Sequence, residues 1–81
     1  MKIYDFNGRK NCCGERVREA RQKLRLSQTD LAARLQIEGV IMERDSVSRM
    51  EKGTRFVADY EVITLAKVLH VSVGWLLEVE Q

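Results

Sequence analysis

Apolar residues recur along this chain at helical spacing, and no segment alternates as a half-buried strand does. An amphipathic stripe at i, i+3, i+4 and i+7 predicts a helix over about residues 13–24: Val17, Ala20, Arg21 and Leu24. Arg21 lies on the inward stripe, where a lone guanidinium would be costly. The pattern therefore predicts a helix whose arginine needs a buried partner.

A second helix is predicted after Ser27, a residue type that caps helix N-termini. Asp30, three positions later, completes a capping box with a shorter side chain than the usual glutamate. The apolar stripe that follows would bury three residues of this helix: Leu31, Ala32 and Leu35.

A third helix is predicted over about residues 44–52, with Val47 and Met50 inward and Gly53 as a left-handed terminator. Its remaining positions are polar and face outward: Arg44, Asp45, Ser46, Ser48 and Arg49. The connection before it, residues 36–43, contains the apolar run Val40-Ile41-Met42.

Two further helices complete the predicted architecture. Asp59 would cap a helix over residues 60–69, with three residues inward: Tyr60, Ile63 and Ala66. Ser72 would cap a short last helix that carries core or interface residues: Trp75, Leu76 and Leu77. Five short helices without a strand pattern indicate an all-α domain.

The length of 81 residues limits the chain to one domain. We expect residues 1–13 to form an N-terminal arm and residues 14–81 the folded domain. The segment Asp5–Gly8 is a turn signal, and Ile3, Tyr4 and Phe6 could pack back on the core. The arm either covers the domain or follows a nucleic acid through Arg9 and Lys10, and the first interpretation is favoured.

The net charge of +2 hides an asymmetry. Residues 1–55 hold 13 lysines and arginines against 8 acidic residues, whereas residues 56–81 hold 1 against 4. A basic portion followed by an acidic end suits contact with a polyanion on one side.

Several classes of protein are disfavoured. The chain has no apolar run long enough for a membrane span and no apolar signal region at its start, so we expect a cytoplasmic protein without membrane contact. Cys12 and Cys13 are adjacent and would need His70 for a metal site, a spacing unlike that of zinc sites. No nucleophile–base pair or glycine-rich phosphate loop is present, so the sequence indicates neither an enzyme nor a cofactor.

The order of these features resembles the Cro/C1-type (XRE-like) helix-turn-helix family of transcriptional regulators. The resemblance covers roughly residues 14–77 and rests on four groups of residues. They are Arg21 with Leu26-Ser27-Gln28, then Leu31-Ala32 with Leu35, then Val47 through Gly53, and then, resembling the closing helices of the family, Ile63, Leu65-Ala66, Leu69, Val71-Ser72 and Trp75-Leu76-Leu77. It implies a five-helix, lambda-repressor-like DNA-binding domain that places the third helix in the major groove.

The resemblance also implies a role for individual residues. The base-reading positions would be Arg44, Asp45 and Arg49. Backbone-contacting or supporting positions would be Gln28, Ser46, Ser48, Lys52, Thr54 and Arg55. Arg21 and Glu51 would form a buried ion pair between the first and third helices, which supplies the partner that the inward arginine needs.

One departure from the family is the distance from Leu31 to Glu51, about five residues longer than usual. The turn between the second and third helices is therefore lengthened within residues 36–43. The apolar run in this segment must either pack on the domain or face a partner.

Two functions follow from these observations. The favoured one is a sequence-specific regulator of transcription, with repression preferred, that binds double-stranded DNA as a homodimer. Its dimer contacts would come from Val40-Ile41-Met42 or from residues 75–79. The alternative is a protein-interaction module, such as an antitoxin or a partner that blocks another regulator.

Overall fold

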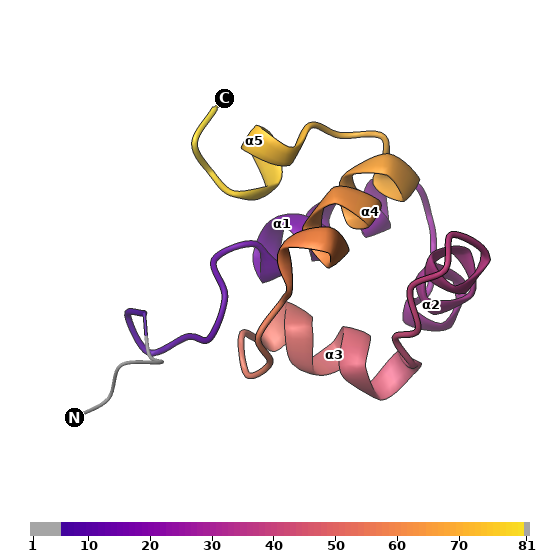
Figure 1. Ribbon diagram of the computed structural model, residues 1–81, viewed down its shortest axis with the longest axis horizontal. Coiled ribbons are helices and arrows are strands. Elements are labelled where there is room, and N and C mark those ends of the chain that lie inside the picture. The colour runs from indigo at the N-terminus through magenta and orange to yellow at the C-terminus, as the bar shows by residue number, and fades with distance from the viewer. Residues whose placement is uncertain (1–5, 81) are drawn as a thin grey trace.

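Five helices form the fold in this computed structural model, which describes residues 6–80: α1 (Gly14–Lys23), α2 (Gln28–Ile37), α3 (Arg44–Lys52), α4 (Asp59–Leu69) and α5 (Val73–Leu76) (Figure 1). Within the described residues the only β-type contact is an isolated bridge between Phe6 and Arg9. The all-α class predicted from the apolar spacing is confirmed.

A single apolar core joins the helices. Nine side chains are almost completely buried in it: Cys13, Val17, Leu31, Leu35, Val47, Met50, Leu65, Leu69 and Leu76. They come from each of the five helices and from the residue before α1, so no helix buries its apolar stripe alone. None of the helices within residues 6–80 is long and apolar enough to cross a bilayer.

The predicted helix ends are largely confirmed because local capping groups set them. Ser27 Oγ accepts from the Asp30 amide at 2.9 Å, and the Asp30 carboxylate accepts from the Ser27 amide at 2.9 Å. Gly53 ends α3 at a φ of 82°, a left-handed conformation that glycine adopts without steric cost. Ser72 Oγ accepts from the Trp75 amide at 3.0 Å and starts α5.

The fourth helix differs from its prediction at its start. Asp59 is the first helical residue, and the cap position belongs to Ala58. Alanine has no side-chain acceptor for the amides of the first turn. Glu61 satisfies a different donor, the amide of Ala58 itself, at 2.9 Å. The carboxylate therefore reaches backward from the first turn, as in the acidic half of a capping box.

The inward face of α4 was also predicted in the wrong register. Tyr60 and Ile63 are 61% and 62% exposed, and only Ala66 of the predicted set is buried. The residues that face the core are Glu61, Val62, Leu65, Ala66, Val68 and Leu69. The helix carries apolar residues on two sides, so its own periodicity does not identify the side that packs.

The connection between α2 and α3 has fewer residues than the predicted segment 36–43, because α2 continues to Ile37. Six residues remain, from 38 to 43. Gly39 has a φ of 89°, and the Val40 amide donates to the Leu35 carbonyl at 2.9 Å, which closes the end of α2. Val40 and Met42 are buried, whereas Ile41 is 69% exposed.

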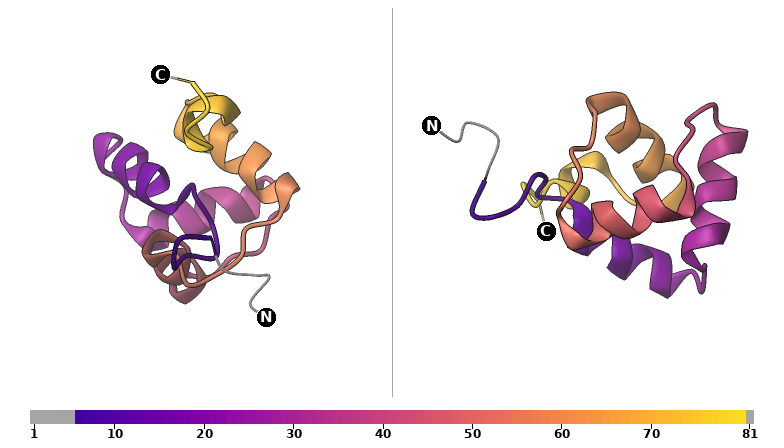
Figure 2. Two further views of the ribbon diagram at one scale, coloured as in Figure 1. Left: turned by 90° about the vertical axis from the view of Figure 1, so that its left-hand side faces the viewer. Right: turned by 90° about the horizontal axis from the view of Figure 1, so that it is seen from below.

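The third helix lies along one edge of the molecule. It occupies the lower edge in Figure 1 and runs across the view from below in Figure 2, with α2 crossing near its N-terminal end. Its N-terminal end therefore meets α2, and its C-terminal end meets the start of α1 and the N-terminal segment.

Candidate nucleic-acid interface

The third helix has a buried face and a charged outer face. Val47, Met50 and Glu51 point into the domain. Four charged residues are exposed on the other side: Arg44, Asp45, Arg49 and Lys52. Ser46 and Ser48 are half-buried along its flanks. An exposed face with arginine forks and a carboxylate offers the hydrogen-bonding groups that distinguish base edges in a DNA major groove.

Two of the predicted base-reading residues contact each other. The Asp45 carboxylate lies 3.4 Å from Nε of Arg49, one helical turn later. Both side chains remain accessible, with 82% and 50% of their surface exposed. The contact restrains the Arg49 guanidinium on the outer face of α3 while its two terminal nitrogens keep donors for another partner.

The predicted pair between Arg21 and Glu51 forms at the base of this helix. Arg21 Nε lies 2.7 Å from Glu51 Oε2, and its Nη2 lies 3.0 Å from Oε1. The remaining terminal nitrogen of Arg21 donates to the Leu26 carbonyl at 2.8 Å. Only 11% and 4% of the two side chains is exposed, so this bidentate pair is screened little by solvent.

Gln28 joins the same group. Its amide nitrogen donates to Glu51 Oε1 at 3.1 Å, and the side chain is half-buried. One N–H of the amide is thus committed to the base of α3, and the other is left for an outside acceptor. The geometry favours a supporting role in which Gln28 fixes the start of α2 against the end of α3.

The loop after α3 presents two of the predicted backbone-contacting residues. Lys52 and Thr54 are exposed on either side of Gly53. The Thr54 amide donates to the Arg49 carbonyl at 2.9 Å, and its hydroxyl donates to the same oxygen at 3.2 Å. This geometry closes the C-terminal end of the helix and holds Lys52 beside it.

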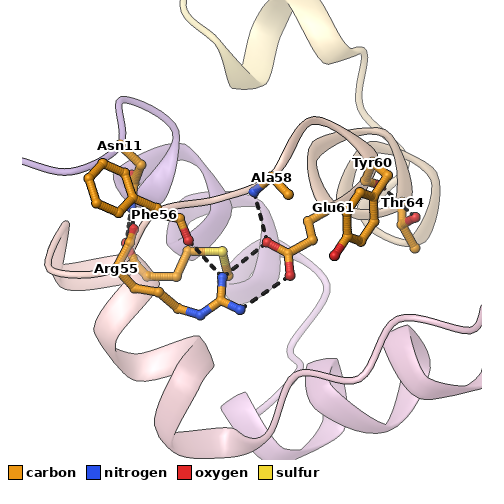
Figure 3. A network of polar contacts seen from close by, with 8 residues as sticks. Asn11, Arg55, Phe56, Ala58, Tyr60, Glu61 and Thr64 are labelled. Carbon is orange, nitrogen blue, oxygen red and sulfur yellow. Dashed lines mark hydrogen bonds and ion pairs between the residues drawn. The ribbon is translucent and has the colours of Figure 1, made fainter. Parts of the chain in front are cut away.

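Arg55, expected to contact the DNA backbone or to support the site, makes contacts that suit a supporting role. Its two terminal nitrogens donate to Glu61 at 3.0 and 3.2 Å, and one of them also donates to the Phe56 carbonyl at 2.8 Å (Figure 3). The Arg55 side chain is 22% exposed. The guanidinium therefore ties the loop to α4, which is a supporting contact.

The contacts with Arg55 and Ala58 lower the pKa of the Glu61 carboxyl group. Burial acts to raise its pKa, but hydrogen bonds from Arg55 and from the Ala58 amide, together with the charge of Arg55, outweigh that effect. The pKa of Glu61 consequently lies below its ordinary value of 4.5. The pair stays ionised at neutral pH and holds the loop that follows α3.

Sequence reasoning missed Asn11, which connects three segments. Its side-chain nitrogen donates to the Met50 carbonyl at 3.1 Å and to the Arg55 carbonyl at 2.8 Å (Figure 3). Its side-chain oxygen accepts from the Gly14 amide at 2.8 Å, which satisfies a free donor at the start of α1. An asparagine three positions before the first residue of a helix is a weak signal, since its carbonyl partners lie 39 and 44 residues away.

Gly14 was missed for a related reason. A Cβ atom at this position would lie 2.2 Å from the Met50 carbonyl oxygen. The start of α1 and the end of α3 therefore approach so closely that a side chain does not fit between them.

The N-terminal segment packs against the same end of α3. Asn7 and Gly8 have φ values of 52° and 81°, and Phe6 and Arg9 exchange backbone hydrogen bonds across this turn. The Lys10 amide donates to the Gly53 carbonyl at 2.8 Å. The turn signal is confirmed from Phe6 onward. The expected packing of Ile3 and Tyr4 lies outside the described residues. The expected packing of Phe6 is wrong, because its side chain is 64% exposed.

The two cysteines differ in environment. Cys12 is exposed, and Cys13 is buried in the core. Burial, followed by the charge of Cys12, raises the pKa of Cys13 to about 11, so its thiol is protonated at neutral pH. Across residues 6–80, no group of three or more histidine, cysteine or acidic side chains gathers as a metal site would require.

Comparisons with known proteins agree with this geometry. The family model described as a helix-turn-helix domain matches residues 13–74. The P22 c2 repressor protein, solved in complex with synthetic operator 9T in the presence of Tl⁺, is similar with a TM-score of 0.71 and 27% sequence identity. The similarity covers 86% of this chain and 98% of the repressor chain. Comparison with curated proteins finds no relative.

The family match covers most of the chain, and the structural match extends over all but a small part of it. The chain therefore belongs to the helix-turn-helix domain family, as a Cro/C1-type (XRE-like) member with the lambda-repressor-like fold.

Proposed function

We propose that this protein is a DNA-binding regulator of transcription that places α3 in the major groove of double-stranded DNA. The observation that carries the proposal is the outer face of α3, where Arg44, Asp45 and Arg49 are exposed while the opposite face is fixed in the core. The similarity to a repressor solved with an operator supports the same function. A helix anchored in this way can present its side chains to base edges without distorting the domain.

Arg49 is the residue to which we assign the main base contact. A guanidinium pairs with O6 and N7 of guanine through two parallel hydrogen bonds, and such a pair contributes about 1–3 kcal/mol of discrimination. Its contact with Asp45 limits the orientations that the fork samples before binding. Arg44, at the start of α3, would read a neighbouring base pair.

Affinity would come largely from phosphate contacts around this face. Lys52 and Thr54 at the end of α3 are the candidates, with the free amide N–H of Gln28 on the other side. Ser46 and Ser48 lie at the edges of the exposed face of α3, and their hydroxyl groups can donate to the phosphates of the DNA backbone. Arg55 is omitted from this set because Glu61 occupies its guanidinium.

Repression and a dimer on DNA extend the proposal. A palindromic operator presents two half-sites about 34–36 Å apart, which requires two copies of α3. Of the apolar run expected to offer a dimer surface, only Ile41 is exposed, because Val40 and Met42 are buried in the core. Of the C-terminal candidates, Val79 is 77% exposed and Leu76 is buried.

Selection of bound sequences from random duplexes tests the proposal. The full chain is compared with Arg49→Ala and with Arg34→Ala, which removes the same charge from the exposed side of α2. We expect an enriched motif for the full chain, loss of preference at one base pair in Arg49→Ala, and an unchanged motif in Arg34→Ala.

Absence of any enriched motif at low salt would reject groove reading and favour the protein-interaction alternative. Salt dependence gives a second criterion, since binding through phosphates weakens steeply as salt rises and binding through apolar contacts does not.

A further inference from the structure

The connection between α2 and α3 holds one apolar side chain out in solvent. Ile41 is 69% exposed, while its neighbours Val40 and Met42 are 7% and 3% exposed. The backbone before it is fixed by the hydrogen bond from the Val40 amide to the Leu35 carbonyl. Because both neighbours are anchored in the core, Ile41 cannot fold inward without pulling them out.

Ile41 also borders a groove that reaches the start of α3. The groove has a volume of about 370 Å³, and its walls include Thr29, Ala33 and Gln36 from the exposed side of α2. Ile41 and Arg44 line the same groove. Since Arg44 belongs to the proposed DNA-reading face, the exposed isoleucine is continuous with that face.

We propose that Ile41 is a specificity-determining residue that contacts the C5-methyl group of a thymine in the major groove, next to the base pair approached by Arg44. The inference rests on the proposed function and assigns a part of the DNA sequence to the lengthened turn. In the major groove, the thymine methyl is the apolar group that an isoleucine can recognise. An isoleucine offers no hydrogen bond, so its exposure beside Arg44 suits this group and not a polar base edge.

The size of the effect follows from the area of one methyl group. Burying a single methyl or methylene group corresponds to about a fourfold change in affinity. Ile41 is exposed, so its replacement by alanine leaves the core intact, and loss of binding by unfolding is not expected.

The test uses the full chain, Ile41→Ala and Ile37→Ala. Ile37 is a matched control, because it is 81% exposed and lines a different groove, with Arg34 and Lys67. Each protein is titrated against the duplex selected by the full chain and against copies in which one thymine at a time is replaced by deoxyuridine, which lacks only the methyl group. We expect one such replacement to weaken DNA binding about fourfold for both the full chain and Ile37→Ala. Ile41→Ala should bind both duplexes equally.

The outcomes separate this inference from the function on which it rests. If Ile41→Ala still distinguishes thymine from deoxyuridine at that position, or if no replacement affects the full chain, Ile41 does not read a methyl group although DNA reading stands. If Ile41→Ala keeps its affinity for DNA but loses self-association in sedimentation, the side chain contacts a second copy and the inference is overturned. If the full chain selects no duplex, both proposals fail.

Discussion

The carboxylate of Asp45 and the Nε of Arg49 lie 3.4 Å apart, one turn from each other on the exposed face of α3. A pair this exposed contributes only about 0.3–0.5 kcal/mol to folding, so its value to stability is small. Its geometric effect is larger, because it restrains the guanidinium proposed to read a base. In the proposed complex, the same carboxylate would repel the phosphates that α3 approaches.

Replacing Asp45 by asparagine should therefore separate specificity from affinity. We expect Asp45→Asn to bind unrelated duplexes more tightly, because a negative charge is removed from the face that meets DNA. Discrimination at the base pair read by Arg49 should fall, up to the roughly 1–3 kcal/mol that a full bidentate contact supplies. Titration of selected and scrambled duplexes measures both quantities, and an unchanged ratio between them would show that Asp45 does not orient Arg49.

Arg21→Ala should destabilise the whole domain. The change leaves the Glu51 carboxylate buried with only the Gln28 amide as a side-chain donor, and loss of one partner from a buried pair costs about 3–5 kcal/mol. Urea unfolding of Arg21→Ala measures the loss. Arg18→Ala, an exposed position on the same helix, is the control. A midpoint equal to that of the unaltered chain would contradict the structural role of the pair.

The Arg55–Glu61 ion pair should make the free energy of unfolding depend on pH in the acid range. The pKa of Glu61 in the folded chain is below its ordinary value of 4.5, so ionisation of Glu61 stabilises the fold fully above about pH 4.5. This contribution is lost as pH falls through the lower, folded pKa. Glu61→Gln should therefore be less stable at pH 7 and should lose less stability than the unaltered chain on acidification.

The measurement is the free energy of unfolding by urea at several pH values from 7 to 3. Glu19→Gln serves as the control, because Glu19 is 54% exposed and pairs only loosely with Lys23 at 3.8 Å. An acid limb of equal steepness in Glu61→Gln and the unaltered chain would mean that Glu61 is not a source of the pH dependence.

The elements that sequence predicted well are those fixed by neighbouring residues. Ser27 with Asp30, and Gly53, mark helix ends because each capping group lies within three residues of the amide or turn that it satisfies. The buried partner of Arg21 was a different case. The energetic cost of an unpaired buried guanidinium required a partner, and the family resemblance identified that partner as Glu51.

The elements that were missed depend on tertiary contacts. Tyr60 and Ile63 looked inward because α4 has apolar residues on two sides, and only its packing against α1 and α2 selects the other stripe. For Arg55, sequence left a backbone contact and a supporting role both open, because it does not show that Glu61 reaches back to the guanidinium. The contacts of Asn11 with α3 and with the loop after it span about half of the chain and carry no local signal.

Asn11 both donates and accepts hydrogen bonds, and two variants separate these contacts. Asn11→Ala removes the cap of the Gly14 amide and the two donations to the Met50 and Arg55 carbonyls. Asn11→Asp keeps an acceptor for Gly14 but cannot donate to either carbonyl. A half-buried side chain with these bonds is worth about 1–3 kcal/mol, and we expect both variants to lose stability in this range.

Hydrogen exchange distinguishes the two variants. The Gly14 amide should exchange faster in Asn11→Ala and remain protected in Asn11→Asp, which still caps α1. The Lys10 amide, which donates to the Gly53 carbonyl beyond the end of α3, should exchange faster in both. If Asn11→Asp is as stable as the unaltered chain, the two donations do not hold the end of α3. The close approach of Gly14 to the Met50 carbonyl would then be the contact that positions α3.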